Sequence, residues 1–270
     1  MAENIIKQIE NNINKVVSKI DGSTNYIDTK YAKHIIGVIG TSGSGVSSFV
    51  PELALYFAQK RKNVLVIDAD LLYPFQNTYN IEQKDVSFVD SVGNPTKINT
   101  TLIKSKFNEK LEFSYQDYLS LTAYIQNSDD FKKYKDCVSL LNKLETIYDL
   151  IVIDFNSYLL NNPIVQALIK KTQLFILMYE DTIKSIKNKQ IIRDNIGLTI
   201  SDDVQILDLK NKVKISDVKA FELPFEKEYE KIYNNGEIFT VSGPSDTDNY
   251  IQSFNKTMEK LVLKMENKEI

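Results

Sequence analysis

The chain has 270 residues, 43% of them hydrophobic, and its 33 basic and 36 acidic residues leave a net charge of −3 at pH 7. This balance gives no general attraction to nucleic acid or acidic lipid, so we expect no nucleic-acid partner. The lone Cys137 and the lone His34 exclude an internal disulfide, a cysteine-rich metal site and a multi-histidine metal centre. The sequence has neither an apolar run of about 18 residues nor a signal-peptide pattern, which predicts a cytoplasmic protein without a transmembrane segment.

Residues 1–21 predict an amphipathic helix, because apolar side chains recur every three or four residues: Ile5, Ile9, Ile13, Val16 and Ile20. The charges of this helix balance, whereas a helix that lies on a membrane normally has a lysine-rich polar face. We therefore expect it to dock onto the domain or a partner, with peripheral membrane contact as an open alternative. Residues 1–25 are the predicted helix and linker, and residues 33–267 form the predicted globular domain.

A short apolar strand over residues 35–39 is followed by a turn rich in glycine and serine and then by an amphipathic helix. Small residues let the backbone N–H groups of such a turn face an anion, and the helix N-terminus adds a partial positive charge. Gly40, Gly45 and Ser47 fit the phosphate-binding pattern G-x-x-x-x-G-K-[ST], but Val46 stands where the pattern has lysine.

The remaining elements predict one α/β domain. A second buried strand, residues 63–68, completes a strand–helix–strand unit, which requires a parallel sheet. Residues 71–148 are the least readable part, with one expected strand (110–113) and one expected helix (138–147). Beyond them we expect alternating strands and helices over 148–154, 161–171, 174–178, 182–195 and 204–209, and a final helix over 247–267. The predicted fold class is a doubly wound, mostly parallel sheet.

Three aspartates accompany the buried strands. Asp68 and Asp70 end the second strand, and Asp154 ends the strand at 148–154. Because ligands bind at the carboxyl ends of parallel strands, these carboxylates and the glycine-rich loop are expected to meet at one edge of the sheet. A nucleoside triphosphate with magnesium needs such a set: a hydroxyl on the metal, carboxylates around its water shell and backbone donors around the phosphates.

This order of motifs resembles the MinD/ParA superfamily of P-loop ATPases. The family motif reads Lys-Gly-Gly-x-Gly-Lys-Ser/Thr, and strands ending in Asp-x-Asp and in Tyr-Asp-x-apolar-apolar-apolar-Asp follow it. Two later stretches also match, Leu223-Pro224-Phe225 and Asn235-Gly236 with residues 242–245. The resemblance spans about residues 34–265 and implies the SIMIBI type of P-loop NTPase fold. The C-terminal part is most similar to TadZ/CpaE proteins, which position pilus-assembly machinery at cell poles, whereas residues 68–74 resemble bacterial tyrosine kinases.

The resemblance implies a role for each matching residue. The nucleotide would be bound by the loop residues Gly40, Thr41, Ser42, Gly43, Ser44, Gly45, Val46, Ser47 and Ser48. Magnesium would be held by Ser47, Asp68 and Asp154, and Asp70 would position the attacking water. Thr41 and Val46 occupy the positions of the two family lysines, and Ser42 replaces the first glycine of the pair.

The loss of both lysines decides which activity to expect. A charge-assisted hydrogen bond contributes roughly 1.5–3 kcal/mol, so one missing phosphate lysine weakens nucleotide binding about tenfold to a hundredfold. A cation on the transferred phosphate is worth about 10³–10⁵ in rate, so efficient hydrolysis is not expected and the catalytic task of Asp70 has lapsed. ATP and Mg²⁺ are the implied cofactors, with weak binding or none.

These patterns favour a degenerate ATPase that dimerises and positions protein partners of a pilus or secretion apparatus, at a cell pole or the inner face of the membrane. The alternative is an active ATPase or tyrosine-kinase-like enzyme with a relocated cation, for which Lys33, Lys60 and Lys62 are the candidates. A third hypothesis, DNA partitioning as in ParA proteins, needs a lysine-lined face, and the sequence offers no such cluster.

Overall fold

The computed structural model describes residues 34–70, 87–115, 130–213, 221–244 and 248–266. The expected N-terminal helix and its linker (1–25) lie outside the described residues. The boundary between this segment and the globular domain therefore stays a prediction.

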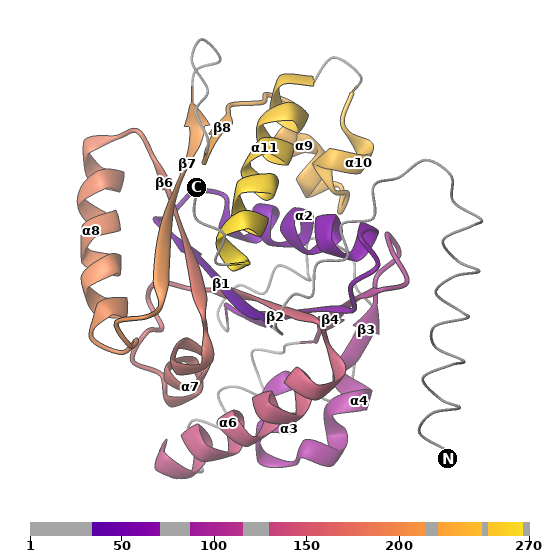
Figure 1. Cartoon of the computed structure of the whole chain (residues 1–270), viewed down its shortest axis with the longest axis vertical. Coiled ribbons are helices and arrows are strands. Elements are labelled where there is room, and N and C mark those ends of the chain that lie inside the picture. The colour runs from indigo at the N-terminus through magenta and orange to yellow at the C-terminus, as the bar shows by residue number, and fades with distance from the viewer. Residues whose placement is uncertain (1–33, 71–86, 116–129, 214–220, 245–247, 267–270) are drawn as a thin grey trace. The chain divides into compact units, whose positions relative to one another are not determined.

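An eight-stranded sheet forms the centre of the described fold (Figure 1). Its strands lie in the order β3-β4-β2-β5-β1-β6-β7-β8, and every neighbouring pair is parallel except β3 with β4. The bounds are β1 His34–Gly40, β2 Val64–Ala69, β3 Leu102–Lys104, β4 Leu111–Ser114, β5 Leu150–Phe155, β6 Leu174–Glu180, β7 Gln205–Val213 and β8 Glu222–Pro224. Strand β1 thus lies between β5 and β6, and its carboxyl end opens into the glycine-rich loop.

Helices cover both faces of the sheet (Figure 1). One layer consists of α2 (Val46–Gln59), α9 (Tyr229–Asn234), α10 (Phe239–Ser242) and α11 (Asp248–Met265). The other consists of α3 (Phe88–Gly93), α4 (Ile98–Thr101), α6 (Asp130–Ile147), α7 (Pro163–Lys171) and α8 (Ile183–Gly197), and a short 3₁₀ turn, η2 (Pro95–Lys97), lies between α3 and α4. The described fold is therefore three layers deep.

The central strands are apolar along their length because helices cover both faces of the sheet. Along β1, Ile35 and Ile39 pack into the layer with α6 and α7, whereas Ile36 and Val38 pack into the layer with α2 and α11. Successive side chains of a strand point to opposite faces, so a strand covered on both faces needs apolar residues at every position. The same reason makes β2 and β5 buried along their whole length.

The predicted fold class is confirmed, since the sheet is doubly wound and mostly parallel. The strands and helices expected over residues 35–70 and beyond residue 148 are present, with ends shifted by a few residues. Within 71–148, the helix expected at 138–147 begins already at Asp130, and α3, α4 and β3 were not predicted. Helix α3 begins with a capping box between Ser87 and Asp90. Because it has only 6 residues, its sequence shows no helical period.

Helix α2 carries a buried carboxyl group, Glu52, which contacts α11. Its side chain is 1% exposed, and its Oε2 atom accepts a hydrogen bond of 2.8 Å from the Tyr250 hydroxyl. Burial raises the pKa of Glu52 to about 8, and hydrogen bonds from Tyr250 and Tyr229 offset only part of that rise. Glu52 is therefore mostly neutral at pH 7, and it links α2 to the C-terminal helices without a buried charge.

Strand β1 contains a glycine that the surrounding core requires. A Cβ atom at Gly37 would lie 2.7 Å from the ring of Phe155 on β5 and 2.8 Å from the ring of Phe175 on β6. These two rings also contact each other, with centroids 5.7 Å apart. Gly37 thus allows the phenylalanines of the neighbouring strands to meet across the middle strand.

We expect Gly37→Ala to lower the free energy of unfolding by about 1–3 kcal/mol, because the two rings must move to admit the methyl group. Urea denaturation measures this change. Gly197→Ala is the matched control, since no atom lies within 4 Å of its Cβ position, and we expect it to be neutral or stabilising by up to about 1 kcal/mol. Equal losses in both variants would contradict the packing described for β1.

Candidate functional site

The loop between β1 and α2 is held in a shape that needs glycine. Gly43 and Gly45 have positive φ angles of 80° and 87°, and Gly45 is the N-cap of α2. The Thr41 N–H donates to the Met178 carbonyl at the end of β6 (3.0 Å), and the Ser44 N–H donates back to the Thr41 carbonyl (2.9 Å). The loop therefore folds back on itself at the carboxyl edge of the sheet, at the start of the helix.

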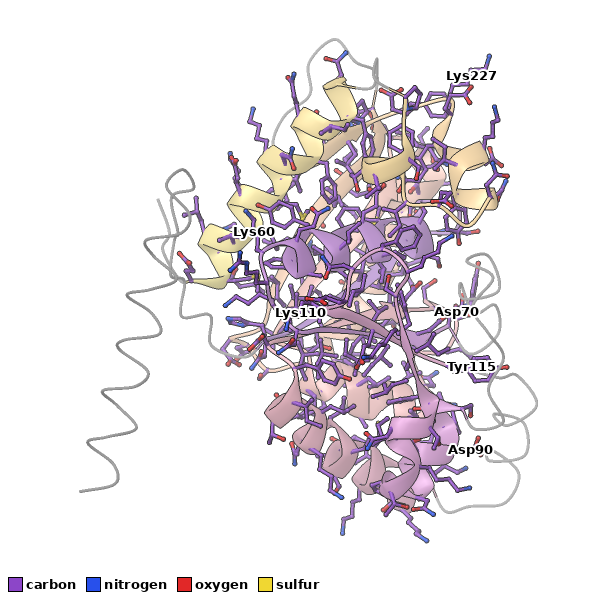
Figure 2. The ribbon with its side chains drawn as sticks, turned by 90° about the vertical axis from the view of Figure 1, so that its right-hand side faces the viewer. Lys60, Asp70, Asp90, Lys110, Tyr115 and Lys227 are labelled. Carbon is purple, nitrogen blue, oxygen red and sulfur yellow. The ribbon has the colours of Figure 1, made fainter. Side chains whose placement is uncertain are left out.

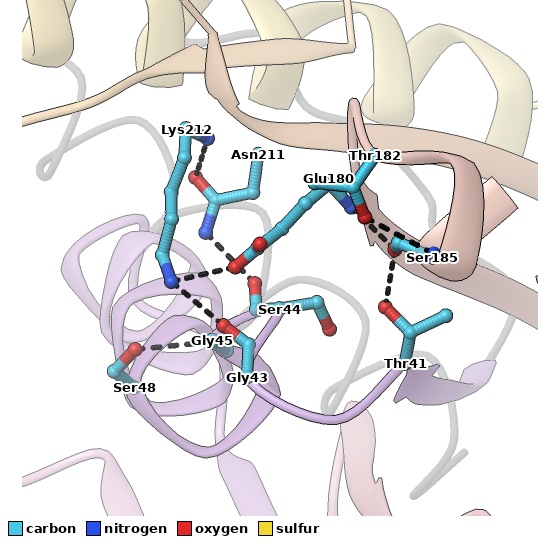
Figure 3. Close-up of polar contacts among 10 residues, drawn as sticks. All are labelled: Thr41, Gly43, Ser44, Gly45, Ser48, Glu180, Thr182, Ser185, Asn211 and Lys212. Atoms are coloured by element: carbon cyan, nitrogen blue, oxygen red, sulfur yellow. Dashed lines mark hydrogen bonds and ion pairs between the residues drawn. The ribbon is translucent and has the colours of Figure 1, made fainter. Parts of the chain in front are cut away.

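Two side chains from the end of β7 bind the carbonyls of this loop (Figure 3). Asn211 Nδ2 donates to the Ser44 carbonyl at 2.8 Å, and Lys212 Nζ donates to the Gly43 carbonyl at 2.9 Å. Lys212 Nζ also forms an ion pair with Glu180 Oε1 at 2.6 Å. Strands β6 and β7 thus fix one side of the loop through groups far away in sequence.

Thr41, at the position of the first family lysine, faces inward. Its side chain is 4% exposed, and its hydroxyl lies 2.7 Å from the Ser185 hydroxyl in the first turn of α8. Ser185 Oγ also accepts a hydrogen bond from the Glu180 N–H, and the Ser185 N–H donates to the Thr182 hydroxyl (Figure 3). Thr41 therefore ties the loop to β6 and α8 and does not extend from the surface.

The structure brings the three predicted carboxylates to the same edge. Asp68 and Asp154 are register partners on the neighbouring strands β2 and β5, and they are 0% and 1% exposed. The Asp70 N–H donates to Asp68 Oδ1 at 3.1 Å, and Asn156 Nδ2 donates to Asp70 Oδ1 at 2.8 Å. Parallel pairing thus places side chains that are 86 residues apart in sequence beside one another.

Asp154 interacts with two other polar residues of the site, Ser47 and Asp70. The pKa of Asp154 is raised to about 7, because burial and the nearby charge of Asp70 outweigh the lowering by a hydrogen bond with the Ser47 hydroxyl. Asp154 thus lies near Ser47, in the first turn of α2, and near Asp70. The Asp154 carboxyl is only partly ionised at neutral pH in the protein alone.

Two buried polar atoms at this edge have no hydrogen-bond partner, Ser44 Oγ in the loop and Asp154 Oδ2 beside it. Orphaned buried atoms of this kind are rare and call for a reason such as a ligand or water. Among the described residues, no group of three or more His, Cys, Asp or Glu side chains could hold a metal by itself. The donors fit Mg²⁺ only as a partner of nucleotide phosphates and water, which is how magnesium is usually bound in such sites.

Two of the three cations proposed from sequence, Lys60 and Lys62, do not reach the loop. Helix α2 has 14 residues and so is about 21 Å long, and Lys60 is the residue that caps its far end, with Lys62 beyond it. Figure 2 shows Lys60 and Asp70 at opposite sides of the molecule. Lys33 lies outside the described residues. Lys60 and Lys62 are therefore wrong as replacements for the missing loop lysine.

Several residues of the site were not predicted, among them Glu180, Ser185, Asn211 and Lys212. The predicted strands ended at residues 178 and 209, whereas β6 continues to Glu180 and β7 to Val213. The rule that ligands bind at carboxyl ends of parallel strands could have pointed to these ends as well. The contacts of these residues with the loop could not be predicted from the sequence, because such contacts depend on the directions of side chains on different strands.

Comparison with known proteins identifies the fold to which this site belongs. No family model and no curated protein matches the sequence. Solved structures do match. MinD with Mg-ADP from Pyrococcus horikoshii superposes with a TM-score of 0.65 at 15% identity, over 84% of this chain and 95% of that chain. A ParA family ATPase from Chlorobium tepidum superposes with a TM-score of 0.66 at 13% identity, over 87% of this chain and 99% of that chain. The fold is that of MinD/ParA ATPases. MinD in the MinC:MinD cell division protein complex of Aquifex aeolicus is similar too, with a TM-score of 0.64 at 16% identity over 84% of this chain and 95% of that chain.

This MinD/ParA-like fold contains, in its described part, no helix that is long and apolar enough to cross a membrane.

We expect Asp154→Asn to stabilise the fold at alkaline pH. An acid whose pKa rises from 3.8 to about 7 on folding costs stability increasingly between these pH values and to a constant extent above pH 7. Asparagine lacks this cost, so the free energy of unfolding at pH 8 should exceed that of the wild type by about 1–3 kcal/mol and the excess should vanish near pH 4.

Urea denaturation at pH 4 and pH 8 measures this difference. Asp202→Asn, at an exposed side chain, is the control and should change the free energy of unfolding by less than about 0.5 kcal/mol. An Asp154→Asn variant less stable than the wild type at pH 8 would contradict the raised pKa.

Proposed function

We propose that this protein binds ATP with Mg²⁺ weakly at the loop 40–48 and works as a dimerising positioning scaffold, not as an efficient ATPase. One observation carries the proposal: the loop has the glycine spacing of a phosphate loop and its Ser47 lies beside Asp154, but an inward-facing threonine and a valine occupy the two lysine positions. The loop backbone and the carboxylates support binding. The missing cations argue against fast hydrolysis.

Within this proposal, the nucleotide lies at the carboxyl edge of β1, β2 and β5. The loop N–H groups and the N-terminus of α2 contact the phosphates, Ser47 is the direct magnesium ligand, and Asp68 and Asp154 hold its water shell. The MinD structure with Mg-ADP, which has the same fold, supports this choice of ligand. Magnesium would also keep Asp154 ionised, because a divalent cation favours the charged carboxylate.

Dimerisation and protein partners form the second part of the proposal. The MinC:MinD complex shows that one protein of this fold assembles with another protein. The likeness of the C-terminal part to TadZ/CpaE proteins favours a pilus or secretion apparatus as the partner and a cytoplasmic position at a pole or the inner face of the membrane. An active ATPase remains the second candidate, because Lys212 brings a cation to the loop from β7.

Titration of Mg-ATP into the protein, followed by calorimetry and by oligomeric mass, tests the proposal. We expect weak binding coupled to dimerisation, and phosphate release no faster than in buffer. Val46→Lys restores the loop cation and should tighten binding about tenfold to a hundredfold. This single change is preferable to a variant that also alters Thr41, whose buried hydroxyl is bonded to Ser185.

Val241→Lys is the matched control, because it adds a lysine at a position that is 55% exposed and remote in sequence from the loop. It should leave the affinity unchanged. No binding by the wild type at millimolar Mg-ATP would overturn the nucleotide part of the proposal. Phosphate release that Asp154→Asn abolishes would favour the active enzyme instead.

A further inference from the structure

The outer side of α8 carries several apolar side chains. Of the eight large hydrophobic side chains that are exposed among the described residues, four lie on α8 or directly after it: Ile183 (77%), Ile186 (44%), Ile191 (58%) and Leu198 (87%). Single exposed apolar side chains are ordinary on a protein surface, whereas several on one element indicate a surface that binds something apolar. In Figure 1, α8 lies beside β6, with its other side turned away from the described elements.

A row of exposed residues runs along this side of the helix. The buried residues of α8 are Ser185, Ile192 and Ile196, and at about 100° per residue they share the side that packs on the sheet. Five exposed residues at spacings of four, three, four and four form the outer row on the opposite side. They are Ile183, Lys187, Gln190, Asp194 and Leu198. Leu198 belongs to the row because, as the C-cap residue, it keeps helical backbone angles.

The outer row matches itself when two copies of α8 run antiparallel. If Ile183 lies opposite Leu198 of a second copy, Lys187 lies opposite Asp194, because each is four residues from its end of the row. Gln190 then meets the outer side of the second copy at its middle. Apolar ends lie against apolar ends, and each lysine lies against an aspartate. A parallel pair would instead place lysine opposite lysine and aspartate opposite aspartate, which is unfavourable.

We propose that the outer side of α8 is a contact surface for a second copy of this chain, with two antiparallel α8 helices related by a two-fold axis near Gln190 and Ile191. A two-fold contact uses the same patch on both copies, so the patch must be complementary to itself. The outer row contains none of the loop residues 40–48, and the contact needs no nucleotide. It goes beyond the proposed function, because it lets copies associate in the absence of ATP.

The surface is small, so the contact is expected to be weak. Helix α8 has 15 residues and is therefore about 23 Å long and about 10 Å wide. Its footprint is well below the roughly 800 Å² per partner of a standard protein interface. Exposed pairs such as Lys187 with Asp194 add little affinity but favour one orientation. We therefore expect a monomer–dimer equilibrium with a dissociation constant of roughly 10–1,000 µM.

Analytical ultracentrifugation of the full chain without nucleotide, at concentrations that span this range, tests the contact. Ile191→Glu should weaken association about tenfold or more, because the two-fold axis brings the two added carboxylates close together. Val241→Glu is the matched control, since Val241 is similarly exposed (55%) but lies on α10, on the other face of the sheet. It should leave association unchanged. A monomeric wild type at every concentration, or an equal loss in both variants, would overturn the proposal.

A charge exchange tests the antiparallel arrangement. Lys187→Glu alone and Asp194→Lys alone each place like charges opposite one another, and each should weaken association severalfold. The double variant with both changes restores opposite charges and should regain the affinity of the wild type. Urea denaturation shows whether the variants are folded. A double variant that associates no better than the single ones would contradict the pairing of Lys187 with Asp194, and the proposal with it.

Hydrogen exchange along α8 separates a second copy from other occupants of this surface. Protection that increases with protein concentration supports the contact between copies. Protection that is the same at all concentrations would show that another part of the same chain covers α8, and it would overturn the proposal.

The nucleotide site is tested separately. Ile191→Glu should bind Mg-ATP as the wild type does, because Ile191 is exposed on α8 and is not part of the loop. A protein that binds no ATP would overturn the proposed function, and its association without nucleotide would still decide whether copies meet at α8.

Discussion

The parallel pairing of β1 with β5 on one side and β6 on the other is the constraint on which the rest of the structure depends. A strand in this place has both faces buried and both edges hydrogen-bonded, so its polar groups can act only at its carboxyl end. Gly37 lets the neighbouring phenylalanines meet across it, and the loop begins where the strand stops. The carboxylates of β2 and β5 reach the same edge because these strands run in the same direction.

The loop itself combines an intact shape with altered chemistry. Its glycines fit the spacing of a phosphate-binding loop and a helix N-terminus follows it, but Thr41 is bonded to Ser185 inside the protein and Val46 is apolar. The loop forms hydrogen bonds with Ser185 of α8 and with Asn211 and Lys212 of β7. Such a loop is held in place before any ligand arrives, so that less ordering is left for ligand binding.

Helix α2 connects this edge with the C-terminal helices. Ser47 in its first turn contacts Asp154, and one turn further Glu52 accepts a hydrogen bond from Tyr250 on α11. Burial raises the pKa of both acids, to about 7 for Asp154 and about 8 for Glu52. The two differ in their surroundings, because Glu52 lies against the aromatic Tyr250 of α11, whereas Asp154 lies beside Ser47 and Asp70 at the carboxyl edge of the sheet.

The sequence by itself determined the class of fold and the loop, because apolar runs, helical periods and the glycine spacing are local patterns. It also located Asp68 and Asp154, since each ends a strand that is apolar throughout. It could not show α3, which is too short for a period, or the contacts of Asn211 and Lys212 with a loop 167 and 169 residues away. Only the tertiary structure decided these, because the order of the strands, with β7 next to β6 and β6 next to β1, determines which strand ends reach the loop.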